Sequence, residues 1–269
     1  MNKGLTAAAE KQYLADRELH VAVRPEVYPV LDSTNTFAKR AGDKGEAEGL
    51  LVIAEHQTGG RGRRGRTFHS PDGTGLYMSL LLRPDCAPEA ALDITTCAAA
   101  ATAEAIEALS GQKTGIKWVN DIYMNGRKVC GILTEAALSA EKGRLAYAVL
   151  GIGVNIFVPV EDFPEEIRQI AGAVFSEKPD GDIRASLAAE IVSRFLGYYE
   201  HLERKDYMQA YRDRMILFGK TVSVHSAVGE VLGEGECLDL DDELRLIVRM
   251  TDGEIRALST GEVSIRGDF

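Results

Sequence analysis

The order of apolar and polar residues along the chain predicts alternating strands and helices. The Asn125-Gly126 pair separates two apolar-rich arms, which is the strongest hairpin signal in the sequence. The arms, at residues 121–124 and 128–137, are therefore expected to pair antiparallel. Further apolar runs predict strands at residues 26–31, 50–54, 76–82, 116–118 and 145–154.

Helical patterns separate or follow these runs. The dense N-cap signal at residues 32–35 precedes a short helix. An alanine-rich stretch predicts a long helix with a smooth surface. Together the patterns predict helices at residues 1–24, 36–41, 88–109, 165–173 and 183–215, the last one broken near residues 205–206.

The end of the chain has a different pattern. Short strand-like runs at residues 221–225, 231–238, 244–250 and 255–265 follow one another at hairpin spacing, which favours a small β-barrel. A chain of 269 residues also suits one large domain with a small one attached. We therefore expect an N-terminal helical extension at 1–25, a main domain at 26–218 and a small domain at 219–269.

Composition narrows the class of protein. With 45% hydrophobic and 27% charged residues the chain resembles an ordinary globular protein. No apolar run approaches the ~18 residues of a membrane span, and no secretory signal is evident, so we expect a cytoplasmic protein with no membrane partner. The four cysteines are far apart without a C-x-x-C pair, which predicts reduced thiols.

One segment concentrates positive charge in a chain whose formal net charge is −10. Residues 59–66 contain four arginines and four glycines. Glycine lets the backbone approach a ligand, and guanidinium groups match carboxylate and phosphate oxygens, so we interpret the segment as an anion-binding loop that is mobile when empty. A broad nucleic-acid surface is disfavoured by the overall acidity.

Two other interpretations of this loop are weaker. Residues 60–65 match the dinucleotide fingerprint G-x-G-x-x-G, but turn-forming residues and a strand follow where that motif needs a helix. A solvated charged loop is the second alternative. It is disfavoured because crowded like charges repel by roughly 3 kcal/mol per pair before salt and side-chain motion reduce this.

The hairpin supplies a second candidate site. Pairing across Asn125-Gly126 brings Lys128 towards Asn120 and Asp121. Lys128 suits one phosphate or carboxylate oxygen, and Asp121 suits Mg²⁺, which takes one or two carboxylates plus substrate phosphates. A surface hairpin with a salt bridge is the alternative. Taken alone, residues 33–35 are more simply explained as a helix cap. Residues 151–155 are either a strand end that passes close to a ligand or a simple bulge.

Taken together, these motifs resemble biotin–protein ligases. The resemblance rests on residues 31–35, Gln57 with residues 60–66, residues 117–121 with 128–133, and residues 151–155, in the order and spacing of that family. Residues 261–266 also resemble the end of its small β-barrel, so the resemblance covers about residues 26–266.

The resemblance implies an α+β (α/β) fold: a class II synthetase-like catalytic domain with a mixed sheet and a C-terminal SH3-like barrel. It implies activation of biotin by ATP to biotinyl-5′-AMP with release of pyrophosphate. The biotinyl group then passes to a lysine of a biotin carboxyl carrier protein, as in acetyl-CoA carboxylase. Mg²⁺ is the implied cofactor, and the oligomeric state, monomer or homodimer, stays open.

The resemblance also implies roles for residues at matching positions. Arg63 and Lys128 are the implied catalytic residues, and Asp121 is the implied Mg²⁺ ligand. The implied nucleotide-binding residues are Arg63, Arg66, Phe68, Asn120, Asn155 and Arg266. The implied biotin-binding residues are Ser33, Thr34, Asn35, Gln57, Gly60, Arg61, Arg63, Lys128, Gly131, Ile132 and Gly151.

Two positions depart from the family pattern. Phe68 stands where relatives often have a tryptophan that stacks on adenine, so we expect weaker but retained stacking. Val119 stands where they have proline, so the stiffness of that turn is in doubt.

Three other functions remain as alternatives: a lipoate–protein ligase, a biotin-dependent transcriptional repressor, and a nucleotide-binding module without catalysis. Because only about 25 residues precede the catalytic region and the chain is acidic, we expect no specific DNA binding.

Overall fold

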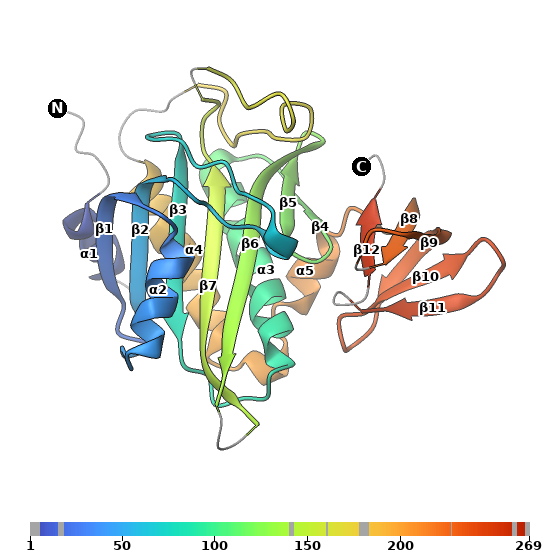
Figure 1. The fold of residues 1–269 in the computed structure, drawn as a ribbon, viewed down its shortest axis with the longest axis horizontal. Coiled ribbons are helices and arrows are strands. Elements are labelled where there is room, and N and C mark those ends of the chain that lie inside the picture. The colour runs from blue at the N-terminus through green and yellow to red at the C-terminus, as the bar shows by residue number, and fades with distance from the viewer. Residues whose placement is uncertain are drawn as a thin grey trace.

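A mixed seven-stranded sheet forms the centre of the computed structural model, which describes residues 6–15, 19–139, 143–159, 161–177, 183–226, 228–259 and 263–266. The strand order is β1-β2-β3-β7-β6-β5-β4 (Figure 1). Only β1 and β2 are parallel; the other neighbours are antiparallel, and the predicted mixed sheet is confirmed. The strands are β1 Arg24–Leu31, β2 Leu50–Gln57, β3 Gly75–Leu82, β4 Gly115–Lys117, β5 Asp121–Met124, β6 Arg127–Leu138 and β7 Leu145–Asn155.

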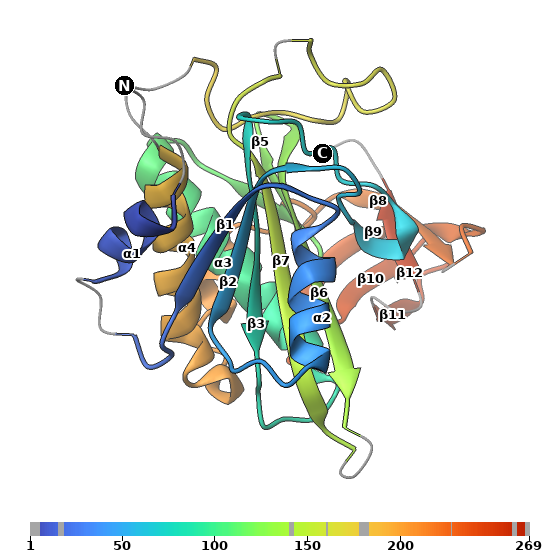
Figure 2. The same ribbon diagram turned by 60° about the vertical axis from the view of Figure 1, so that its left-hand side comes forward.

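Helices cover both faces of this sheet. Helix α2 (Thr34–Asp43) lies on one face, and α3 (Ala90–Ser110) and α4 (Ile183–Tyr199) lie on the other, with α1 (Ala7–Ala15) beside α4 (Figures 1 and 2). Strand β3 is buried along its whole length because it is covered on both faces. Ala98–Ala101, Ala103 and Ala105 of α3 are buried, and their small side chains let the helix pack closely on its neighbours. No helix among the described residues is long and apolar enough to cross a membrane.

Two predicted helices differ from the structure. Of the described residues in the stretch 1–24, Ala7–Ala15 are helical and residues 19–23 are not; the chain enters β1 at Arg24, whose amide donates to Gly49 O. Residues 165–173 form turns instead of a helix. There Lys128 donates its amide to Ile170 O (2.7 Å) and Gly172 donates to Lys128 O (2.8 Å). Pairing with the start of β6 thus overrides the local helical pattern.

The predicted break in the last helical stretch is confirmed. Helix α4 ends at Tyr199, a 3-10 turn spans Leu202–Arg204, and α5 covers Met208–Asp213. Lys205 adopts a left-handed backbone conformation at the break (φ 53°). The short helix predicted at 36–41 begins earlier, at Thr34, with Ser33 as its N-cap.

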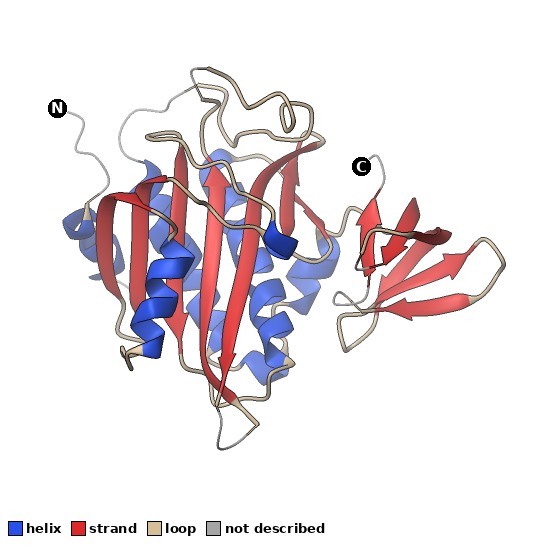
Figure 3. Ribbon diagram, viewed as in Figure 1, coloured by secondary structure: helices blue, strands red, loops and turns tan. Residues whose placement is uncertain are grey.

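A second, five-stranded antiparallel sheet follows α5 (Figure 3). Its order is β11-β10-β9-β8-β12, so the strand predicted at 255–265 is two strands. Pairing of β11 with β12, which would close a barrel, is not among the described pairings. Gly261 and the side chain of Arg266 lie outside the described residues. The strands are β8 Thr221–Ser226, β9 Val231–Leu240, β10 Leu246–Met250, β11 Ile255–Leu258 and β12 Val263–Arg266.

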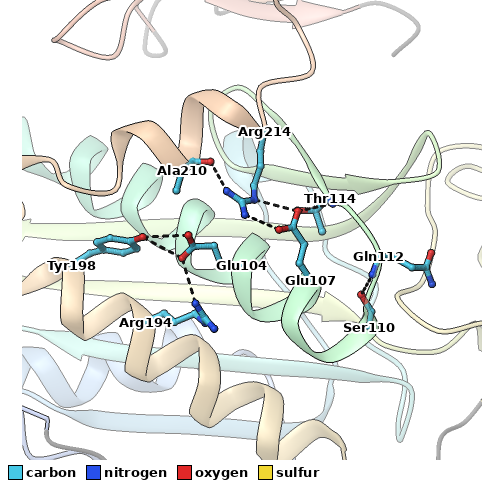
Figure 4. Close-up of polar contacts among 9 residues, drawn as sticks. All are labelled: Glu104, Glu107, Ser110, Gln112, Thr114, Arg194, Tyr198, Ala210 and Arg214. Atoms are coloured by element: carbon cyan, nitrogen blue, oxygen red, sulfur yellow. Dashed lines mark hydrogen bonds and ion pairs between the residues drawn. The ribbon is translucent and has the colours of Figure 1, made fainter.

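Polar contacts anchor the connection between the two sheets. The Glu107 carboxylate in α3 accepts hydrogen bonds from Arg214 Nη2 (2.6 Å) and from the amide and hydroxyl of Thr114 (both 2.9 Å) (Figure 4). Burial by itself would raise the pKa of Glu107, but these bonds hold it below its ordinary value. Across the sheets, Trp118 Nε1 donates to Leu244 O (3.0 Å).

Candidate active site

One cavity collects most of the predicted site residues. It has a volume of about 520 Å³ and lies between α2, the arginine-rich loop and the sheet surface of β6 and β7. Of the predicted residues that the structure describes, Gly60 is not part of its lining, and the side chain of Arg266 lies outside the described residues. The predicted residues that line it are Ser33, Thr34, Asn35, Gln57, Arg61, Arg63, Arg66, Phe68, Asn120, Asp121, Lys128, Gly131, Ile132, Gly151 and Asn155.

The arginine-rich segment, residues 59–68, is a small hairpin that we call the arginine hairpin. Phe68 donates its amide to Gly60 O (3.0 Å), and Gly62 donates to Arg66 O (2.7 Å). The turn has Arg64 at φ 56°, a left-handed conformation. The strand β3 follows, so the dinucleotide-binding interpretation is excluded by the absence of a helix after the glycines.

Gly60 has a structural reason to be glycine. A Cβ at this position would lie 2.3 Å from Phe68 O and 2.6 Å from Ser70 Oγ. The two arms of the arginine hairpin therefore approach too closely for any other residue. This explains the glycine without contact between Gly60 and a ligand.

Cations of the site are held by polar partners from other strands. Lys128 Nζ lies 2.6 Å from Asp121 Oδ1, which confirms that the Asn125-Gly126 hairpin brings these residues together. Arg63 Nη1 donates to Asn120 Oδ1 (2.9 Å). Burial lowers the pKa of Arg63, opposed by the nearby negative charge of Asp121. Polar groups of the protein thus hold Arg63 and Lys128 at this end of the cavity.

The other end of the cavity is neutral. Thr34 N donates to Gln57 Oε1 (2.9 Å), and Gln57 Nε2 donates to Ser70 Oγ (2.9 Å). Ser79 Oγ lies 2.8 Å from Thr34 Oγ1 and 2.6 Å from Asn35 Oδ1. We call these five residues the amide end. Thr34, Asn35 and Ser79 are all buried, so this end is built of internally bonded groups.

Asn35 lies directly over Gly151. A Cβ at Gly151 would lie 1.9 Å from Asn35 Oδ1. Gly151 pairs with Ser79 in β3 and with Leu133 in β6, so the Asn35 amide spans three neighbouring strands. Its Nδ2 lies 3.3 Å from Leu133 O and 3.1 Å from Glu135 Oε2. The glycine predicted as a ligand contact makes room for an asparagine.

Phe68 packs against two further glycines. Gly131 and Gly153 are paired across β6 and β7. A Cβ at Gly153 would lie 2.6 Å from the Phe68 ring, and one at Gly131 would lie 3.3 Å from it. Tyr77 meets the ring edge-on, with centroids 6.3 Å apart. The Phe68 ring therefore packs directly against the backbone of these two glycines inside the cavity.

Several lining residues had no predicted role. The polar ones include Arg64, Thr67, Lys117, Tyr123 and His69; burial and the neighbouring His56 lower the pKa of His69. Among the apolar ones, Phe163, Ile167 and Ile170 come from the segment after β7, and the last two lie in residues 165–173, whose period predicts a helix. That same period marks a one-sided apolar surface, which is the signal that could have identified them.

Buried Tyr211 supports the site from α5. Its hydroxyl donates to Val119 O (3.0 Å), next to Asn120. Burial raises the pKa of Tyr211 well above its ordinary value, and the charge of Arg63 opposes the shift. Nothing in the local sequence around residue 211 signals this contact.

Metal ligands in this site are few. Among the described residues, no group of three His, Cys, Asp or Glu side chains is placed to hold a metal ion. Asp121 is the carboxylate that lines the cavity, and it is paired with Lys128. One carboxylate fits an ion that arrives with substrate phosphates, and does not fit a resident ion with protein ligands alone. The buried cysteines are free thiols, as predicted.

Comparison with known proteins gives one consistent result. Residues 27–155 match the model of the biotin/lipoate A/B protein ligase family. The bifunctional ligase/repressor BirA of Bacillus subtilis is 31% identical over 278 residues, which cover 98% of this chain and 82% of that protein. The biotin–[acetyl-CoA-carboxylase] ligase of Mycobacterium tuberculosis is 28% identical, covering 86% of this chain and 85% of the relative.

A solved structure agrees with this assignment. The biotin protein ligase from Aquifex aeolicus in complex with biotin and ATP has a TM-score of 0.73 and 25% identity, and the match covers 90% of this chain and 98% of that one. The sheet, the cavity and the full-length similarity lead to the same conclusion. The chain belongs to the biotin/lipoate A/B protein ligase family.

Proposed function

We propose that this chain is an ATP-dependent biotin–protein ligase. It activates biotin as biotinyl-5′-AMP, releases pyrophosphate, and transfers the biotinyl group to a lysine of a biotin carboxyl carrier protein. The observation that carries the proposal is the division of one cavity into a neutral amide end and a cationic end. Such a cavity suits a ligand with a neutral polar head and a carboxylate that reacts with a nucleotide phosphate.

Biotin has this division of chemistry. Its ureido ring is neutral and carries both N–H donors and a carbonyl acceptor, and its valeryl chain ends in a carboxylate. We assign the ring to the amide end, near Ser33, Thr34 and Gln57, and the chain to the sheet surface near Gly131 and Ile132. The carboxylate then lies towards Arg61, Arg63 and Lys128.

The cationic end supplies the chemistry of the first step. A carboxylate that attacks the α-phosphate of ATP meets like charge, and Arg63 and Lys128 neutralise both partners while holding them together. No side-chain nucleophile is needed because the carboxylate itself is the nucleophile. In the second step the carrier lysine attacks the mixed anhydride, and the same cations stabilise the leaving AMP phosphate.

The nucleotide lies next to these cations in this proposal. Phe68, seated on its glycine pair, offers a ring face for adenine, and Arg66 and Asn155 face the nucleotide. Arg266 caps the nucleotide from the second sheet. Asp121 is the residue that would hold a Mg²⁺ ion brought by the ATP phosphates, and that ion would draw charge from the leaving pyrophosphate.

Mass spectrometry of a carrier protein tests the proposal directly. The full chain is incubated with biotin, ATP, Mg²⁺ and an unmodified biotin-carrier domain, and the intact mass of the carrier is recorded. The expected result is a gain of one biotinyl group that requires ATP. An unchanged carrier mass, with carrier and enzyme both folded, would contradict the proposal.

A lipoate–protein ligase is the nearest alternative within the family. Pyrophosphate release separates the two: biotin should support it and lipoate should not. A preference for lipoate would overturn the choice of substrate.

We further propose that the chain does not bind specific DNA, because its formal net charge of −10 opposes a phosphate backbone. An electrophoretic shift that needs both biotin and ATP would contradict this. The cytoplasmic location stays a prediction from the sequence. Light scattering of the eluted protein distinguishes monomer from homodimer.

A further inference from the structure

A buried serine sets the direction of hydrogen bonds at the amide end. Ser79, in β3, is fully buried and is not part of the cavity lining. Its hydroxyl lies within hydrogen-bond distance of Thr34 and Asn35, both of which line the cavity. No function assigned so far uses this hydroxyl.

The orientation of the Asn35 amide is fixed by its surroundings. One side of the amide faces two acceptors, Leu133 O at 3.3 Å and Glu135 Oε2 at 3.1 Å. Neither oxygen has a hydrogen to donate, so the NH₂ group must lie on that side. The carbonyl oxygen of Asn35 therefore faces Ser79 at 2.6 Å.

This orientation determines where each hydroxyl hydrogen lies. The Asn35 carbonyl oxygen can only accept, so Ser79 gives it the single hydrogen of its hydroxyl. The contact of 2.8 Å between Ser79 and Thr34 then requires Thr34 to be the donor. With its one hydrogen directed at Ser79, Thr34 cannot donate to Gln57 Oε1, which lies 3.2 Å away.

The consequence appears at the cavity wall. Thr34 Oγ1 turns lone pairs, not a hydrogen, towards the cavity. Gln57 Oε1 already accepts from Thr34 N and keeps its remaining lone pair for a ligand. Both oxygens thus require a donor from whatever binds against them.

We infer that Ser79 is a positioning residue that makes the Thr34 hydroxyl a hydrogen-bond acceptor, so that the site selects ligands with an N–H group at this end. The inference rests on the proposed biotin ligase function. The ureido ring of biotin carries N–H donors, whereas the dithiolane ring of lipoate has none. An enclosed site that requires a donor rejects a ligand lacking it, because its own polar groups are left unpaired.

A matched pair of ligands tests this inference. Biotin is compared with its cyclic carbonate isostere, in which ring oxygens replace the two ureido nitrogens, by calorimetric titration of the full chain. We expect the wild-type protein to bind the isostere at least about tenfold more weakly than biotin. In Ser79→Ala the Thr34 hydroxyl is released to donate, so the ratio of the two affinities should shrink several-fold.

Other outcomes contradict the inference. If Ser79→Ala weakens the binding of both ligands equally and leaves the ratio of their affinities unchanged, Ser79 has only a structural role. Equal binding of both ligands by the wild-type protein contradicts it as well. If Ser79→Ala does not fold, Thr34→Val and Thr34→Ser decide. The ratio of the two affinities should shrink in Thr34→Val, which keeps only the Gln57 acceptor, and should persist in Thr34→Ser; a ratio that persists in both overturns the inference.

The test is separate from the test of the proposed function. If the wild-type protein biotinylates a carrier but binds biotin and the isostere with equal affinity, only the role of Ser79 is refuted. A protein that binds neither ligand and leaves the carrier unmodified refutes the proposed function itself.

Discussion

The two ends of the cavity are organised by opposite means. At the amide end, buried neutral groups bond to one another and rest on Gly151. At the cationic end, Lys128 pairs with Asp121 across the Asn125-Gly126 hairpin, and the side chain of Arg61 remains 44% exposed beside Glu135. One end is shaped by packing and hydrogen-bond direction, and the other by charge.

This difference indicates how each end recognises its ligand. Buried neutral groups keep their geometry when the ligand is absent, so binding there needs little reorganisation. Crowded cations repel until an anion arrives, so the arginine hairpin gains stability from the ligand itself. The amide end therefore serves ligand specificity, and the cationic end serves catalysis.

Removing Lys128 should have the largest effect. Lys128→Ala should lower kcat/KM for pyrophosphate release by about 10² to 10³-fold, because a charge-stabilising donor is lost from the reacting phosphate. Biotin affinity should change much less. Lys113→Ala, an exposed lysine outside the cavity, is the matched control. Equal activity of the two variants would remove Lys128 from catalysis.

A single methyl group should disrupt the amide end. Gly151→Ala places a Cβ 1.9 Å from Asn35 Oδ1, so the amide must move and its buried bonds are lost. We expect a loss of about 2 to 4 kcal/mol in the free energy of unfolding and weaker biotin binding. Gly197→Ala is the control, since nothing lies within 4 Å of that position and the change should stay within ~1 kcal/mol. Equal melting temperatures in both variants would refute the close contact.

Hydrogen exchange should separate the two ends dynamically. Exchange across residues 58–73 should slow by about tenfold or more when biotin or its adenylate binds, because the anion orders the arginine hairpin. Amides of α2, already fixed at the amide end, should change little. Unchanged exchange in residues 58–73 would count against a lid over the acyl-adenylate.

Salt should weaken one end selectively. Between ~0.05 M and ~0.5 M salt, we expect the KM for ATP to rise about three- to tenfold as the partly exposed cations are screened. The dissociation constant of biotin should change far less because its head is neutral. A parallel rise of both constants would show that charge governs the whole cavity.

The smallest effect concerns pH. Because burial and His56 lower the pKa of His69 below its ordinary value of 6.5, the folded protein binds this proton less readily than the unfolded chain. The resulting stability is present above pH 6.5 and is lost as pH falls below it. His69→Asn should flatten the decline of melting temperature from pH 7 to 5.5 by about 1 to 2 °C. Identical slopes in both proteins would exclude this contribution.

Local patterns predicted much of this architecture. The Asn125-Gly126 signal placed Lys128 beside Asp121 because hairpin pairing is set by neighbours in sequence. Apolar runs predicted the strands for the same reason. The helix expected at 165–173 was wrong because its backbone bonds to the start of β6, a partner that no local pattern reveals.

The residue pattern predicted the strands, the arginine loop and the residue types of the site, and the family resemblance implied the mixed sheet. The roles of the glycines became clear from the folded chain: Gly151 makes room for Asn35, and Phe68 packs against Gly131 and Gly153. Folding also brought Ser79 and Tyr211 to the site. These contacts join strands and helices far apart in the chain, and their hydrogen-bond directions depend on groups that meet only after folding.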